Sequence, residues 1–376
     1  MSAQRVEVHR IPMRGPGDVS GLAKLLRAGT LAAVDIVAIL GKTEGNGGVN
    51  DFTREYACRA YAHALAPELQ CRPEDVEGRI AMVMSGGTEG VLSPHASVFA
   101  RRQVEAATGN AKRLAIGIAH TRRFLPEELG RAEQIEETAK AVKIAMADAQ
   151  IYEASDVHYV QIKCPLLTAE RVEEALSRGK RTVTEDSYAS MAYSRGASAL
   201  GVALALGEIA GPVDERAVLW NWELYSAVAS ASAGIEQTCS AVVVIGNSIS
   251  AASDCVIGHG LMRDAIDLAG VMQAFSSVGL DASRGLNGHA GNRIVNVFAK
   301  AESSPDGQVR GYRHTMLDDS DITATRHARA AVGGLIAGVA GCGAVYVSGG
   351  AEHQGPPGGG PIAVIARAGE TAAASR

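Results

Sequence analysis

Three lysines and three serines recur in a fixed order along the chain, and this pair of residue types can do nucleophilic chemistry. Each lysine ends a short apolar run, and each serine begins a Ser-x-Gly-x-Glu sequence further along. The lysines are Lys42, Lys163 and Lys300, and the serines are Ser85, Ser232 and Ser348. Lysines gathered at one place disfavour each other's charge, and a neutral lysine can take the proton of a serine hydroxyl. The pattern predicts a Ser–Lys site if the fold brings these positions together.

A helical segment that carries arginine lies between each lysine and its serine. Arg54 belongs to "DFTREYACRAYAHAL" and Arg195 to "SYASMAYSRGASALG", while "DITATRHARAAVGGLIAG" contains both Arg326 and Arg329. Guanidinium groups bind carbonyl oxygens and anions with fixed geometry. The last two arginines are three residues apart and share a helix face, so spacing alone does not separate them.

The elements that must position these residues read as strand–Lys, helix–Arg, glycine-rich turn–Ser and strand, three times over. Short runs rich in Val and Ile are typical of buried strands, and their alternation with helices predicts an α/β fold. Two units open with a strand and a helix, "VEVHRIPM" with "DVSGLAKLLRAG" and "RLAIGIAHT" with "EQIEETAKAVKIAMADA". The third unit is predicted to open mostly as helix, "LMRDAIDLAGVMQAFSSVG", after a short "CVIGH".

The repeat predicts three units, over residues 1–105, 112–250 and 256–376. The stretches "EAATGNAKR" and "SAASD" mark their boundaries. Three like units in one chain can close around an internal pseudo-threefold axis, and equivalent residues then converge on it. Strand ends are the rim where ligands bind in such sheets, so we expect one pocket lined by three similar sets of side chains.

Composition narrows the classes of partner. The chain has 376 residues, a formal net charge of −5 and 4% aromatic residues, with no basic block, which argues against nucleic acid or an acidic membrane surface. No apolar run approaches the roughly 20 residues of a membrane helix, and no signal-peptide core is present. Six cysteines form no C-x-x-C pair, which predicts reduced, buried thiols in a cytoplasmic protein.

No organic cofactor is expected, because no G-x-G-x-x-G follows a first strand. The loop "GPPGGGP" at residues 355–361 has two interpretations. It is either a flexible loop only, or its carbonyls hold a hard cation together with Glu302.

Several long motifs resemble the cyanuric acid amidohydrolase/barbiturase family, and within it the cyanuric acid hydrolases. They are "GKTEGNGGVNDFTREYA", "MSGGTEGVLSPH", "QIKCPLLT", "YSRGASALG", "ASASAGIE", "RIVNVFAKAE", "RHTMLDDSDI" and "VSGGAEHQGPPGGGP". The similarity runs across nearly all of the chain and recurs in all three units.

The resemblance implies three concatenated α/β units in a toblerone-like fold, a cyclic imide as substrate, and a homotetramer. It implies that cyanuric acid is opened to carboxybiuret, which then gives biuret and carbon dioxide. It implies Ser232 as nucleophile and Lys163 as base. The implied substrate-binding residues are Lys42, Arg54, Ser85, Gly86, Arg195, Ser232, Ala233, Lys300, Arg329, Ser348 and Gly349. A structural Mg²⁺ or Ca²⁺ is implied near Glu302, Ala351, Gln354, Gly355, Pro356 and Gly359.

Local charge offers partial independent support for the second pair. Lys42 and Lys300 each have a glutamate two residues on, Glu44 and Glu302, on the same face of an extended chain. Lys163 is followed instead by Cys164 and a proline. A nearby carboxylate favours a charged lysine, so Lys163 is predicted to be the lysine with the least help to stay protonated.

Two rival functions remain open. A barbiturase would do the same chemistry on a pyrimidine ring, and residues around Thr325 are expected to tune this choice. A non-catalytic ring-binding protein could use the same cluster for recognition only, although all three serines and all three lysines are intact.

Overall fold

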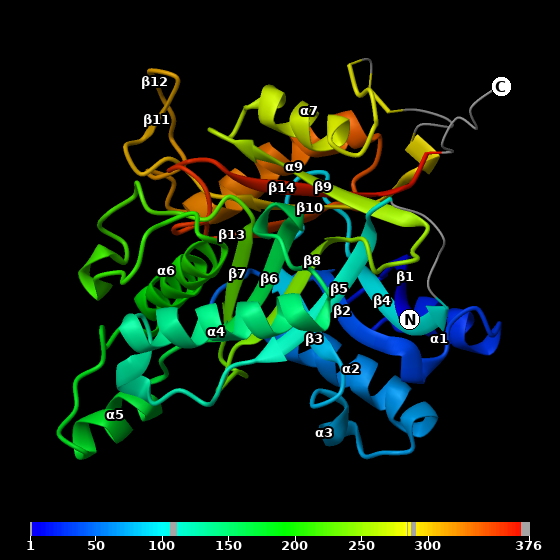
Figure 1. Cartoon of the computed structure of the whole chain (residues 1–376). Helices are drawn as coiled ribbons and strands as arrows, with labels where there is room; N and C mark the ends of the chain where they lie inside the picture. Colours follow the sequence, from blue (N-terminus) through cyan, green and yellow to red (C-terminus); the bar gives the residue numbers. More distant parts are fainter. Residues whose placement is uncertain (1, 106–110, 284, 287–290, 370–376) are drawn as a thin grey trace.

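Three four-stranded sheets form the centre of the computed structural model, which describes residues 2–105, 111–283, 285–286 and 291–369 (Figure 1). The first sheet has the order β1-β4-β2-β3, the second β5-β8-β6-β7 and the third β9-β14-β10-β13. The first contains β1 (Ser2–Pro12), β2 (Ile36–Thr43), β3 (Ala81–Gly86) and β4 (His95–Glu105). The second contains β5 (Arg113–His120), β6 (Val157–Pro165), β7 (Ala229–Gly234) and β8 (Ala241–Ser248). The third contains β9 (Cys255–Met262), β10 (Ile294–Ala301), β13 (Tyr346–Gly349) and β14 (Gly360–Arg367).

The three sheets repeat one topology down to an irregularity in register. In each, the first two pairs of neighbouring strands are antiparallel and the last pair is parallel. The same strand of each sheet has a register shift near its start, at Ile36/Ala38, Val157/Tyr159 and Ile294/Asn296. The predicted α/β class with three concatenated units is confirmed. Of the first predicted boundary, residues 106–110 lie outside the described part of the chain.

Helices cover the outside of the sheets, with α2 and α3 at the bottom of Figure 1, α4 to α6 at the left, and α7 and α9 at the top. Their bounds are α1 Ser20–Arg27, α2 Phe52–Leu69, α3 Pro73–Val76, α4 Ala132–Asp148, α5 Ala169–Ser177, α6 Ser187–Leu206, α7 Leu268–Ser276 and α9 Ala324–Ala340. A short hairpin of β11 (Gln308–Val309) and β12 (Tyr312–Arg313) projects beside α9.

Local chemistry fixes the ends of the arginine-bearing helices. Asp51 and Asp186 cap α2 and α6 by accepting the backbone N–H of Thr53 and Ala189. A side-chain oxygen at this position satisfies an N–H that has no partner within the helix. Gly207, just past α6, has a φ of 72°, which suits a residue without a Cβ. Each cap sets where its helix begins, and therefore where the arginine points.

The three units share one core at the centre of the molecule. Side chains from all three sheets pack there, including Phe99, Tyr159, Phe298 and Tyr346. Phe298 lies 5.2 Å from Tyr159 and 5.5 Å from Tyr346 between ring centroids. Each unit also has its own core between sheet and helices.

Two sequence predictions about elements were wrong. β9 runs through Met262 and pairs with β14 along its whole length, so the third unit opens with a full strand and α7 begins only at Leu268. The pairing with a strand whose residues are 98 to 112 positions away outweighs the local helical pattern, as tertiary context commonly does. The three serines lie within the strands β3, β7 and β13 rather than in the turns that follow.

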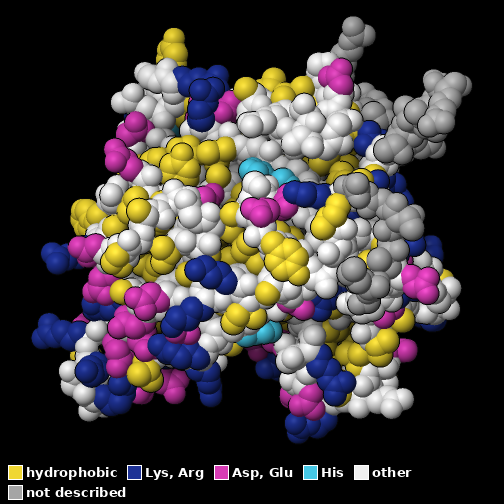
Figure 2. All heavy atoms as spheres, viewed as in Figure 1, with side chains coloured by type: hydrophobic (Ala, Val, Ile, Leu, Met, Phe, Trp, Pro, Cys, Tyr) yellow, Lys and Arg dark blue, Asp and Glu magenta, His cyan; other side chains and the backbone are white. Residues whose placement is uncertain are grey.

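On the face drawn in Figure 2, Lys and Arg side chains are interspersed with Asp and Glu and form no continuous basic area. Among the described residues, no helix is long and apolar enough to cross a membrane. The six cysteines are free, and Cys58, Cys164 and Cys255 are buried whereas the other three are half-buried.

Candidate active site

The parallel strand pairs place each lysine directly opposite its serine. The register pairs are Lys42 with Ser85, Lys163 with Ser232, and Lys300 with Ser348. All six side chains are buried. The Oγ atoms of Ser85 and Ser348 lie 3.3 Å apart although 263 residues separate them. The sheets therefore bring residues of distant parts of the chain to one place.

One small pocket is lined by residues of all three units. Its lining consists of Gly47, Arg54, Met84, Ser85, Gly86, Lys163, Met191, Arg195, Ser232, Ala233, Arg329, Ser348 and Gly349. Nine of the predicted substrate-binding residues are in this set, together with the predicted base Lys163. Lys42 and Lys300 lie behind it, bonded to Ser85 and Ser348. Met84, Met191 and Gly47 were missed, because no repeated motif marks them.

The three Ser–Lys pairs differ in their hydrogen bonds. Lys42 Nζ donates to Ser85 Oγ at 3.0 Å, and Lys300 Nζ donates to Ser348 Oγ at 3.2 Å. Lys163 Nζ donates instead to the carbonyl of Met84 in the first unit, at 3.1 Å. Ser232 Oγ is buried and has no hydrogen-bond partner within the described residues. The hydroxyl of Ser232 can therefore bind a ligand without first breaking a hydrogen bond to a lysine, unlike those of Ser85 and Ser348.

The predicted absence of a carboxylate beside Lys163 was wrong. Glu236, the last residue of the second Ser-x-Gly-x-Glu, lies 3.1 Å from Lys163 Nζ through its Oε1. Glu44 is exposed, and Glu302 accepts hydrogen bonds from Thr325 and the N–H of Gly350. The prediction considered only residues that follow Lys163 on β6. It fails because the carboxylate of Glu236 follows the neighbouring strand β7 instead.

Burial acts strongly on the other two lysines. The pKa of Lys42 is well below its ordinary value, because burial and then the charge of Arg329 disfavour the ammonium. The pKa of Lys300 falls to about 7 for the same reasons, with Arg195 as the nearby cation.

Each pocket arginine comes from the helix that lies between the lysine and the serine of its unit. Arg54 lies near the start of α2, Arg195 on α6 and Arg329 on α9. Arg329 is 3% exposed and lines the pocket, whereas the side chain of Arg326 is 39% exposed and does not. Both contact Glu89, the last residue of the first Ser-x-Gly-x-Glu. The structure thus separates two arginines that the sequence could not.

Thr325 does not line the pocket. Its Oγ1 donates to Glu302 at 3.2 Å, and its methyl group lies against Gly349, which does line it. Any influence of Thr325 on a bound ring therefore passes through Gly349 or Glu302.

The predicted cation ligands gather beside this region. Glu302 is half-buried and accepts the N–H of Gly350, and the following loop packs against Ser304 through Gly358. Burial and the charge of Glu352 raise the pKa of Glu302, which a bound cation would counter. The oxygens of Gln354, Ala351 and Pro356 each already accept one hydrogen bond. One carboxylate with amide and carbonyl oxygens is a donor set of the kind that Mg²⁺ and Ca²⁺ prefer. Among the described residues, no three His, Cys, Asp or Glu side chains form a cluster for a metal.

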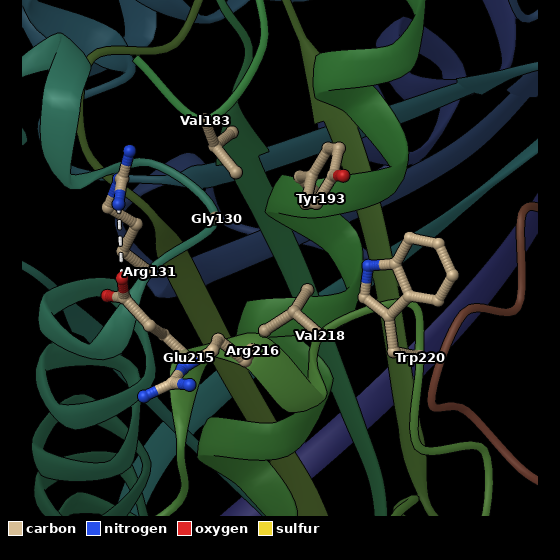
Figure 3. A pocket seen from close by; sticks show the side chains of 8 residues that line it. All are labelled: Gly130, Arg131, Val183, Tyr193, Glu215, Arg216, Val218 and Trp220. Carbon is tan, nitrogen blue, oxygen red and sulfur yellow. Dashed lines mark hydrogen bonds and ion pairs between the residues drawn. The ribbon is translucent and has the colours of Figure 1, made fainter. Parts of the chain in front are cut away.

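A larger cavity lies elsewhere, beside the start of α6, and lacks such chemistry (Figure 3). It has a volume of about 510 Å³ and holds an ion pair between Arg131 and Glu215 at 3.0 Å, with Tyr193 and Trp220 on the other side. None of its lining residues is a serine, cysteine or lysine. The small threefold pocket is therefore the candidate active site.

Comparison with known proteins identifies the family of the chain. A family model described as amidohydrolase ring-opening protein matches residues 7–367. A cyanuric acid amidohydrolase of Bradyrhizobium diazoefficiens is 63% identical over 369 residues, covering 98% of this chain and 99% of the relative. One from Pseudomonas sp. strain ADP is 59% identical over 366 residues, covering 96% of this chain and 99% of the relative. A solved cyanuric acid hydrolase, whose description refers to structural concatenation, has a TM-score of 0.93 at 58% identity, covering 97% and 100% of the two chains. The chain therefore belongs to the family of ring-opening amidohydrolases and is an enzyme.

Proposed function

We propose that this enzyme hydrolyses cyanuric acid, opening the ring to carboxybiuret, which then loses carbon dioxide to give biuret. The observation that carries the proposal is the pocket itself, where three equivalent Ser, Lys and Arg sets meet. A flat ring with three equal carbonyls could meet the same chemistry at each edge. The names of the full-length relatives support the same substrate.

Ser232 is the proposed nucleophile and Lys163 the proposed base. Lys163 takes the Ser232 proton as the Oγ–carbon bond forms, and backbone N–H groups beside the serines hold the tetrahedral oxyanion. The ring C–N bond then breaks, and the nitrogen takes a proton from Lys163. Water activated by Lys163 releases the acyl group and restores the serine. The assignment is supported by the Ser232 hydroxyl, which has no hydrogen-bond partner within the described residues and is available to a substrate.

One observation favours a different pair. Lys42 is hydrogen-bonded to Ser85, and its lowered pKa suits a neutral base. The serine variants S85A, S232A and S348A decide between them. We expect S232A to lower kcat by about 10³-fold or more, and the other two to act mainly on KM. A larger loss of kcat in S85A would assign the chemistry to the first unit, and a trapped acyl group on Ser232 would exclude that.

The rival activities need two further measurements. Turnover of cyanuric and barbituric acid at equal concentration tests the barbiturase alternative, and we expect the triazine to be preferred. A ring-binding protein without catalysis would bind the compound and form no biuret. The variant T325A tests whether Thr325 changes the ratio of the two rates.

We further propose a structural divalent cation and a cytoplasmic homotetramer. The ion would be held by Glu302, Ala351, Gln354, Gly355, Pro356 and Gly359, and it would neutralise a half-buried carboxylate and fix the loop. Elemental analysis of the purified protein tests this, and chelation should lower the melting temperature of wild type but not that of E302Q. Light scattering in solution tests the tetramer.

A further inference from the structure

The three Ser-x-Gly-x-Glu glutamates are equivalent in sequence, and two of them make the same contact. Glu89 of the first unit receives Nε and Nη2 of Arg329 at 2.8 and 2.6 Å, from the third unit. Glu352 of the third unit receives the same two nitrogens of Arg195 at 2.8 and 2.6 Å, from the second. The pseudo-threefold relation then calls for a pair between Glu236 of the second unit and Arg54 of the first.

That third pair is replaced by a different one. Glu236 lies on Lys163 at 3.1 Å. Arg54 donates to the carbonyls of Gly48 and Ala233, at 2.8 and 3.5 Å, and its buried Nε has no partner within the described residues. One departure of the pocket from threefold symmetry therefore lies at this carboxylate, and it falls on the pair proposed to do the chemistry.

We propose that Glu236 is a positioning residue that completes a Ser232–Lys163–Glu236 triad, while Arg54 lines the pocket with no carboxylate partner among the described residues. The inference rests on the proposed function. As the proton moves from Ser232 Oγ to Lys163 Nζ and the Oγ–carbon bond forms, the carboxylate stabilises the ammonium without accepting the proton. A buried aspartate serves a histidine in this way in serine hydrolases. Within the described residues, Lys42 and Lys300 hydrogen-bond to serine and carbonyl oxygens and form no ion pair with a carboxylate.

The surroundings of Glu236 keep it ionised for this role. Burial alone would raise the pKa of Glu236, but the charges of Lys163 and Arg54 outweigh it and lower the pKa. Cys58 and Glu77 on the α2–α3 side and Arg171 on α5 also interact electrostatically with Glu236, and Cys164 on β6 does so with Lys163. The other charged or titratable residues that line a cavity together with Glu236 are Glu55, Arg59, His63 and Glu74. The Lys163 side chain is 1% exposed and that of Glu236 15%, so little solvent screens their contact.

The matched variants E236Q, E89Q and E352Q test the inference, since each removes one charge at an equivalent position. For E236Q we expect kcat to fall about 10²–10⁴-fold with little change in KM. The acid limb of its kcat/KM profile should move to lower pH, because a base without a neighbouring anion gives up its proton more easily. E89Q and E352Q should act mainly on KM and leave the position of this limb unchanged.

Equal effects in all three variants, or an unshifted acid limb in E236Q, would overturn the inference. If E236Q does not fold, as judged by its thermal transition, E236D carries the test, and its pH limb should lie nearer that of wild type than the limb of E236A. If the wild-type enzyme does not open cyanuric acid, the proposed function itself is contradicted. The two failures are therefore distinguishable.

Discussion

Lys42, Lys163 and Lys300 occupy equivalent positions but different electrostatic surroundings. Lys42 is fully buried between a cation and its serine, whereas Lys163 faces a carboxylate. A buried lysine destabilises the fold while it is charged, so its cost depends on pH in a way that equilibrium unfolding can measure.

Lys42 should make the protein more stable as the solution becomes more alkaline. Its pKa is well below 10.5 in the folded protein, so at pH values just below 10.5 the unfolded chain binds more protons than the folded chain. Stability then rises with pH, by up to about 1.4 kcal/mol per unit. We expect urea unfolding of wild type and K42M to diverge in this direction between pH 8.5 and 10. The control K24M, at an exposed lysine, should follow wild type.

Arg329 and Arg326 offer a matched test of pocket lining. R329Q leaves the half-buried carboxylate of Glu89 short of two hydrogen bonds and removes a cation from the pocket. We expect a rise in KM of about 10-fold or more and a loss of about 3–5 kcal/mol in unfolding free energy. R326Q, at a partly exposed position, should change both by far less. Equal effects would refute the assignment of Arg329.

The sequence predicted the parts of the site that recur in all three units. It did not predict the contacts in which one unit differs from the other two. Ser85, Ser232 and Ser348 were found because one motif recurs three times, and the sheet register explains why they meet. The different partner of Glu236 leaves no trace in the motif, since its sequence matches the other two. Side-chain partners across units depend on packing that spacing along one chain does not encode.

At the scale of elements, the cap of α2 links a pocket loop to a pocket arginine. Asp51 accepts the N–H of Thr53 at 3.0 Å and that of Gly47 at 2.8 Å, and Arg54 follows within the first turn. We expect D51A to lose about 1–2 kcal/mol of stability and to raise KM, because both the helix start and Gly47 lose their anchor. D186A, at the more exposed cap of α6, should lose less. An unchanged KM in D51A would show that the cap does not position the pocket.

Elements with strong local patterns were predicted well. The runs that became β2, β6 and β10 are apolar and buried, and α4 and α6 lie where helical segments were expected. The last two residues of β9, Leu261 and Met262, were mistaken for the start of a helix, because their pairing with β14 is not visible in the local sequence. The three serines were predicted to lie in turns after the strands. They belong to the strands themselves, because each pairs with a lysine of the parallel neighbouring strand.

At the scale of the whole molecule, the shared aromatic core predicts that the three units unfold together. Phe298 is fully buried between side chains of the first and second units. We expect F298A to lose about 3–5 kcal/mol and to lower hydrogen-exchange protection in strands of all three sheets. F275A, in the outer core of the third unit, should lower protection mainly there. Separate thermal transitions in the wild-type protein would contradict this coupling.

Glu236 pairs with a lysine, whereas the equivalent Glu89 and Glu352 pair with arginines, and this difference is possible only because the three units belong to one chain. Were the three units separate copies of one polypeptide, symmetry would force every copy to carry the same side chains, and a change in one would appear in all. Joining them in a single chain removes that restriction. A symmetric ring can then be gripped by three like edges while only one edge is specialised to break a bond.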